Sequence, residues 1–221
     1  AEPEYLLAKR LYDLNSVRVG VLGEGIDTEW HSQCSGDRFR QNYGISGDFI
    51  LFAGRKDAGK RADELVRFFC RYMEINPHRN IKLVFIGGGS LDIPDKYRER
   101  ICDLGFVSVE DKHDAFAAAS FLCNPSWFES FSLVVMESWI AKRPVLVSEH
   151  CAVTTNFCLE ANGGLYFRDF LTFAGTVDYL LDHEDVARKM GENGFRYVMD
   201  NFTHEVIGRK YLGFIEECLE D

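Results

Sequence analysis

Two glutamates eight positions apart, Glu129 and Glu137, have the type and spacing that most clearly suggest chemistry in this 221-residue chain. An apolar run typical of a helix, residues 131–136, lies between them. If Ser130 or Ser132 caps that helix, the first carboxylate lies just before its amino end and the second about two turns in. Helical side chains lean toward the amino terminus, so the second carboxylate can point back toward the first. We therefore expect both carboxylates to bind hydroxyl groups of one ligand.

The beginning of this helix would also supply hydrogen-bond donors. The first N–H groups of a helix have no intrahelical acceptor, so the amides of residues 131–134 would face the same pocket. Their partial positive charge suits a phosphate group. The segment thus combines acceptors for sugar hydroxyls with donors for a phosphate.

Positive side chains gather in one short segment of an otherwise acidic protein. The net charge of −10 argues against nucleic acid or an anionic lipid surface as the main partner. Residues 55–61 contain four basic side chains and one acid, Asp57. The segment follows an apolar run at 49–53, so Arg55 and Lys60 would project from the carboxyl end of a strand, where open α/β sheets bind ligands. We expect a small polyanion to bind there.

The same segment partly fits a nucleoside-triphosphatase P-loop, which we keep as an alternative. Gly54, Gly59 and Lys60 match G-x-x-x-x-G-K after a strand. Arg61, however, stands where a serine or threonine must bind magnesium. No D-x-D pattern occurs and the six histidines are scattered, so we expect no metal and no cofactor.

Strands that alternate with helices should position these residues. Apolar runs bounded by glycine, proline or polar residues predict strands at 17–21, 48–53, 81–86, 121–123 and 145–147. Helical periodicity predicts an opening helix ending near Asn15 and further helices at 60–74, 94–102, 111–119, 132–141, 169–182, 184–200 and 203–219. This alternation predicts an α/β fold, a Rossmann-like, doubly wound parallel sheet with helices on both faces, followed by carboxyl-terminal helices.

The bulk composition is that of a globular protein. No run of about 20 apolar residues occurs, so we expect no transmembrane segment. The seven cysteines include no C-x-x-C pair and no Cys/His cluster, which favours reduced thiols and a cytoplasmic location.

Taken together, these segments resemble the family-4, retaining, GT-B type glycosyltransferases, which transfer a sugar from a nucleotide-diphosphate donor. Glu129 and Glu137 match the E-x7-E signature of that family. Further matching segments follow in the same order and spacing over residues 17–205: Gly25-Ile26-Asp27, Phe52-Ala53-Gly54-Arg55 with Lys60, Phe85-Ile86-Gly87-Gly88-Gly89, Gly105-Phe106-Val107, Asn124-Pro125-Ser126, Pro144-Val145 and Gly163-Gly164-Leu165. The match is to the second, donor-binding half of such an enzyme.

The resemblance implies roles for the charged residues. The donor diphosphate would lie against Arg55, Lys60 and the backbone of Leu133 and Val134. The catalytic residues would be Glu129, Arg55 and Lys60, of which the two cations stabilise the charge that develops as the nucleotide leaves.

The rest of the donor would lie along the same helix. The resemblance places the sugar beside Glu129, Phe131, Ser132 and Leu133, and the ribose hydroxyls on Glu137, whose carboxylate can accept both. The base would lie near Phe106 and Val107.

The resemblance also divides the chain. Residues 1–16 would be a helix at the junction with a missing amino-terminal domain, 17–202 the nucleotide-sugar-binding domain, and 203–221 a helix that crosses back to the missing domain. That domain would bind the unknown acceptor and could attach the protein peripherally to a membrane, so we expect these residues alone to be inactive. A non-catalytic nucleotide-sugar-binding domain is the main alternative.

Several residues depart from the family pattern. The usual E-G-F-G reads Glu129-Ser130-Phe131-Ser132. Lys142 replaces a small residue, Arg61 replaces a glycine, and Glu24 replaces a frequent asparagine. If residue 130 or 132 needs a positive φ, serine adds strain of about 1 kcal/mol. We expect altered donor affinity or a different sugar.

Overall fold

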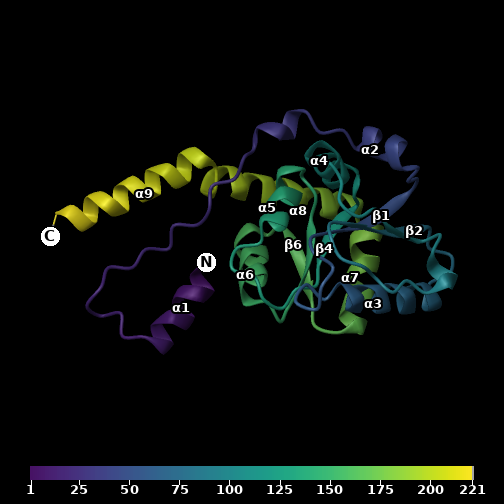
Figure 1. Cartoon of the computed structure of the whole chain (residues 1–221), viewed down its shortest axis with the longest axis horizontal. Helices are drawn as coiled ribbons and strands as arrows, with labels where there is room; N and C mark the ends of the chain where they lie inside the picture. Colours follow the sequence, from purple (N-terminus) through teal and green to yellow (C-terminus); the bar gives the residue numbers. More distant parts are fainter. Residues whose placement is uncertain (221) are drawn as a thin grey trace.

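A six-stranded, fully parallel sheet forms the centre of the computed structural model, which describes residues 1–220 (Figure 1). Its strands are β1 (Asp48–Ala53), β2 (Ile81–Ile86), β3 (Ile101–Asp103), β4 (Phe121–Asn124), β5 (Val145–Ser148) and β6 (Gly164–Phe167). The order β3-β2-β1-β4-β5-β6 grows outward from β1 in one direction and from β4 in the other. The direction reverses between β1 and β4, which is where such sheets bind ligands.

Helices cover both faces of this sheet. The covering helices are α2 (Gly36–Tyr43), α3 (Ala62–Ile75), α4 (Val109–Ala118), α5 (Leu133–Ile140), α6 (Ala152–Ala161), α7 (Phe170–Asp182) and α8 (Glu184–Asn201). Helices α1 (Glu2–Leu11) and α9 (His204–Leu219) belong to the two ends of the chain, and 3-10 turns lie at Glu29–Ser32 and Asp95–Tyr97. Successive strand residues point to opposite faces. Phe49 and Leu51 accordingly pack in the core with α2, α4, α5, α6 and α8, whereas Ile50 and Phe52 pack with α3 and α7. The predicted doubly wound fold is confirmed.

The carboxyl-terminal half of α5 is anchored in the core by Trp139. This side chain is fully buried, and its indole N–H donates a hydrogen bond to the Gly163 carbonyl oxygen at 2.8 Å. A Cβ on Gly194 of α8 would lie 2.2 Å from the indole ring, so a larger residue there would push α8 away. This packing fixes the direction of α5 and therefore the place where the helix begins.

Two predicted elements are wrong. Residues 17–21 form no strand, because the sheet offers them no neighbour, and Val17 and Val19 are 55% and 43% exposed. Residues 94–102 form no α-helix. Tyr97 and Ile101 have helical spacing, but Ile101 instead begins β3 and pairs with Leu83 of β2. Helices α2 and α6 were not predicted.

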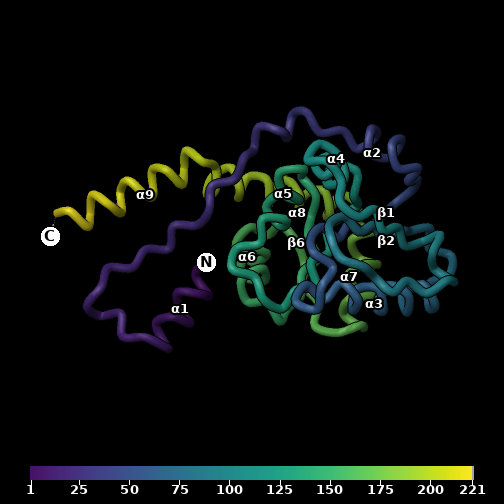
Figure 2. The backbone as a smooth tube through the Cα atoms, in the orientation of Figure 1, coloured from purple at the N-terminus to yellow at the C-terminus, as the bar shows by residue number. Residues whose placement is uncertain are grey.

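The two ends of the chain project from the main body. Figure 2 shows the trace from α1 to α2 running extended for much of its length, and α9 pointing away from the sheet. Ile26 forms an isolated bridge with Thr203 at the base of α9. The predicted final segment 203–221 ends at Asp221, which lies outside the described residues. Within residues 1–220 no helix is both long and apolar enough to cross a membrane.

Candidate functional site

A cavity of about 280 Å³ lies at the carboxyl ends of β1 and β4, where the strand order reverses. The end of β1 contributes Gly54 and the end of β4 contributes Asn124. The loop from β4 to α5 adds Glu129, and the first turn of α5 closes one side. The full lining consists of Glu24, Phe52, Ala53, Gly54, Lys60, Cys123, Asn124, Glu129, Ser130, Phe131, Ser132, Leu133 and Val134.

The Glu129 carboxylate is held by a cation and an amide. The Lys60 ammonium lies 2.7 Å and 2.8 Å from its two oxygens, and the Asn124 side-chain amide donates to it at 3.2 Å. The Glu129 side chain is only 8% exposed, whereas Lys60 is 29% exposed. The Asn124 amide also donates to the Ser132 hydroxyl at 2.9 Å. These contacts fix the carboxylate beside the amino end of α5.

The beginning of α5 is turned sharply by Ser132. This N-cap residue has φ 71°, the left-handed conformation anticipated from its place in the sequence pattern. The turn presents the first helical residues, Leu133 and Val134, to the cavity. Because their N–H groups belong to the first turn, they have no intrahelical acceptor and can donate to an anion.

Two further departures from the family pattern, Arg61 and Lys142, also have positive φ, 54° and 56°. Residues other than glycine are strained in this conformation. Arg61 is stabilised by its side chain, which donates to Glu64 at 2.7 Å and 2.8 Å and stacks 3.8 Å from the centre of the Trp127 ring. Arg61 supplies no hydroxyl for magnesium, so the P-loop alternative gains no support here.

The basic segment does not present all its charges to the cavity. Lys56 is buried and its ammonium pairs with Asp103 at 2.5 Å. Arg55 is 79% exposed, lies 3.6 Å from Asp57 and does not line the cavity. Of the four predicted cations, Lys60 is the one that lines it.

Glu137 faces α4 and does not line the cavity. Its carboxylate accepts a hydrogen bond from the Lys112 ammonium at 2.5 Å, and its side chain is 14% exposed. Burial raises the pKa of Glu137, and the nearby Lys112 ammonium partly opposes that rise. The structure therefore places the second glutamate beside the cavity rather than in it.

The residues predicted for a base also lie outside the cavity lining. Phe106 is 85% exposed, and a Cβ on Gly88 would lie 2.6 Å from its ring. Val107 is partly buried against the core. The structure thus brings together six predicted residues, Lys60, Glu129, Phe131, Ser132, Leu133 and Val134, and leaves Arg55, Glu137, Phe106 and Val107 around them.

Sequence reasoning missed the contacts of Asn124 and Lys112. Asn124 lies in a segment that the family pattern includes, so its position was visible but its two side-chain hydrogen bonds were not. Lys112 lies 25 positions before Glu137 on another helix, and nothing in the sequence signals that pairing.

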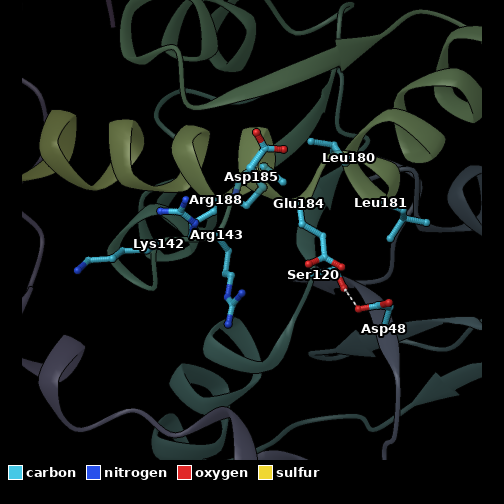
Figure 3. Close-up of a pocket in the computed structure, with 11 residues that line it drawn as sticks. Asp48, Ser120, Lys142, Arg143, Leu180, Leu181, Glu184, Asp185 and Arg188 are labelled. Carbon is cyan, nitrogen blue, oxygen red and sulfur yellow. Dashed lines mark hydrogen bonds between the residues drawn. The ribbon is translucent and has the colours of Figure 1, made fainter.

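A larger cavity, of about 520 Å³, lies at the opposite, amino edge of the sheet (Figure 3). Asp48, the first residue of β1, accepts a hydrogen bond there from Ser120 at 2.9 Å. Lys142, Arg143 and Glu184 also line it, so its walls contain both charge signs. It contains none of the predicted site residues. Among residues 1–220, no group of three or more His, Cys, Asp or Glu side chains could hold a metal ion.

Comparison with known proteins identifies relatives of one kind. The sequence model of the family described as "Glycosyl transferases group 1" matches residues 47–183. A D-inositol 3-phosphate glycosyltransferase of Corynebacterium aurimucosum is 30% identical over 199 residues, which are 82% of this chain and 47% of the relative. The chain spans about half the length of the curated relatives it matches.

Solved structures show the same fold. Sucrose-phosphate synthase from Thermosynechococcus elongatus superimposes with a TM-score of 0.79 at 18% identity, over 99% of this chain and 57% of that one. Anabaena HepE, solved in complex with UDP-glucose, superimposes with a TM-score of 0.71 at 14% identity, over 87% of this chain and 56% of that one.

Proposed function

The chain belongs to the group 1 glycosyl transferases, and from that premise we propose that it binds the nucleotide-diphosphate sugar from which the sugar is transferred. The observation that supports this most is the cavity between β1 and β4, where Lys60, Glu129 and the first turn of α5 meet. It offers a cation, a carboxylate and free backbone donors within one small space. A sugar diphosphate needs that combination.

In this proposal the diphosphate lies against the amino end of α5. The amides of Leu133 and Val134 donate to its oxygens, and Lys60 neutralises part of its charge. Arg55 has an exposed side chain that can turn toward the outer phosphate. The positive charge at these positions stabilises the nucleotide as it leaves, because negative charge develops on the departing diphosphate in the transition state.

The sugar then lies beside Glu129 and Ser132. The Glu129 carboxylate accepts hydrogen bonds from sugar hydroxyls, as a carboxylate without protons can only accept. Phe131 contributes through its backbone, since its ring packs edge-on against Phe157 and Phe202. Leu133 closes the sugar site from the helix side.

The nucleoside extends outward from the same helix. Glu137 accepts the two ribose hydroxyls, and Phe106 and Val107 border the base. The exposed Phe106 ring offers a face for stacking.

We place the transfer itself in a two-domain assembly. The second domain would bind the acceptor, and transfer would proceed with retention at the sugar carbon. The reaction would need no metal, because Lys60 and the α5 amides supply the positive charge. The part of the chain described here would bind donor without turnover. The exposed apolar residues Leu212 and Ile215 of α9 suit contact with that domain. Seven free cysteines support a reducing, cytoplasmic setting.

Calorimetric titration tests this proposal. UDP-, GDP- and ADP-sugars and ATP would be titrated into the protein, each with magnesium and with EDTA. We expect one diphosphate sugar to bind equally in both conditions. Magnesium-dependent binding of ATP alone would favour the nucleoside-triphosphatase alternative, and release of sugar by the protein on its own would contradict the need for a second domain.

A further inference from the structure

Helix α4 brings one positive charge to α5, outside the cavity lining. The Lys112 ammonium lies 2.5 Å from one oxygen of the Glu137 carboxylate. The lysine side chain is 33% exposed and the glutamate side chain 14% exposed, so the pair is partly shielded from water. The two helices pack against each other, and the contact fixes the glutamate on the side of α5 that faces α4.

We infer that Lys112 is a positioning residue that keeps the Glu137 carboxylate ionised and oriented to accept the ribose hydroxyls, an inference that rests on the function proposed above. A carboxylate has about four acceptor positions. Lys112 uses a position on one oxygen, so room for two hydroxyl donors remains. If Glu137 were protonated, one of its oxygens would carry an O–H group that donates a hydrogen bond. The carboxyl group could then no longer accept hydrogen bonds from both ribose hydroxyls in the same way.

The surroundings of Glu137 make this dependence on Lys112 strong. Burial raises the pKa of the carboxyl, and Lys112 is the charged group that lowers it. The elements packed on α5 are α4, α8, β4 and β5, and among the described residues none besides Lys112 brings a charge that acts on the carboxylate. The neighbouring His113 is stacked on Trp30 with ring centres 4.0 Å apart. Glu129, at the start of the same segment, is paired with Lys60.

Removing the Lys112 charge should therefore make donor binding depend on pH. Without the ammonium, the raised pKa of the Glu137 carboxyl is no longer opposed, so the ionised form is lost as pH falls through that pKa and recovered as pH rises above it. In the wild type the Lys112 ammonium, 2.5 Å from the carboxylate, favours the ionised form. Lys112→Arg preserves a cation and should behave as the wild type does.

The test is calorimetric titration with UDP-glucose between pH 5.5 and 8.5, because its diphosphate is a diester and does not titrate there. Wild type, Lys112→Met and Lys112→Arg are compared, with Lys189→Met as a matched control on the exposed face of α8. We expect Lys112→Met to bind about tenfold more weakly at pH 6 and to recover toward pH 8.5. The other three proteins should change less than about threefold. The 2′,3′-dideoxy analogue should bind all four proteins alike.

The outcomes separate this inference from the proposed function. Equal pH profiles for wild type and Lys112→Met would overturn the role of Lys112. Weakening that is the same at every pH, or the same for the dideoxy analogue, would show a general packing effect and would also overturn it. Failure of the wild type to bind any of UDP-, GDP- and ADP-glucose would overturn the proposed function, and this inference with it. Thermal melting confirms that each variant is folded.

Discussion

Replacing Lys60 by alanine separates what its charge contributes to ligand binding from what it contributes to folding. In the free protein the ammonium is already paired with Glu129 at 2.7 Å and 2.8 Å. A charge-assisted hydrogen bond contributes about 1.5–3 kcal/mol, or roughly 10- to 150-fold in Kd. Because the diphosphate must share Lys60 with Glu129, we expect the lower part of that range, about 10- to 30-fold weaker binding.

The same substitution leaves the Glu129 carboxylate, 8% exposed, with Asn124 as its remaining partner. A buried charge without its partner costs about 1–3 kcal/mol or more, so the variant should also unfold at a temperature lower by several degrees. Adding Glu129→Gln removes the unpaired charge. The double variant should regain stability without regaining affinity for the diphosphate.

The assay compares the nucleoside diphosphate that the wild type binds most tightly, among UDP, GDP and ADP, with the matching nucleoside. Lys189→Ala, at an exposed position on α8, serves as the matched control. Loss of affinity for the diphosphate but not for the nucleoside is the expected result. Equal loss for both ligands, or no loss in a folded variant, would refute the placement of the phosphates at Lys60.

Other predictions concern backbone strain and close packing. Lys142→Gly should raise stability by about 1 kcal/mol, or about 2–4 °C in Tm, because the residue has φ 56°. Ser132→Gly should change stability little, since it relieves similar strain but loses the hydrogen bond from Asn124, and Ser132→Ala should cost about 1 kcal/mol. Gly87→Ala should lower the free energy of unfolding by at least about 2 kcal/mol, because its Cβ would lie 2.1 Å from the Gly54 carbonyl oxygen. Gly208→Ala in α9, where a Cβ would enter open space, should raise the free energy of unfolding by about 0.5–1 kcal/mol. Thermal and urea unfolding check all five substitutions, and a stabilising Gly87→Ala would contradict the packing described.

Much of the fold follows from short-range patterns in the sequence. Apart from Asp48 and Lys82, the strands at 48–53 and 81–86 are apolar and buried on both faces, which is how buried parallel strands appear. The failures have a long-range cause. Val17, Val19 and Val21 alternate as a strand would, but a strand requires a neighbour and the sheet has none to offer there. Ile101 instead joins β2, a pairing that local periodicity cannot reveal.

In the candidate site too, local patterns predict some features, and others depend on contacts between distant parts of the chain. The positive φ of Ser132 could be anticipated, because a family pattern with glycine there implies a left-handed residue. The pairing of Lys60 with Glu129 joins residues 69 positions apart and depends on β1 and β4 being neighbours. The sequence also did not reveal that the basic side chains of residues 55–61 lie in different environments. Lys56 is buried against Asp103, whereas Arg55 points outward. Residue type thus indicated the chemistry, and the sheet order decided which side chains share the cavity.

The most direct test of the proposed donor site is a map of backbone amide shifts by NMR as UDP-glucose is added. The account predicts the largest changes at Leu133, Val134 and Lys60, at the carboxyl edge of the sheet between β1 and β4. Changes confined to the cavity at the amino edge, around Arg143 and Glu184, would contradict it.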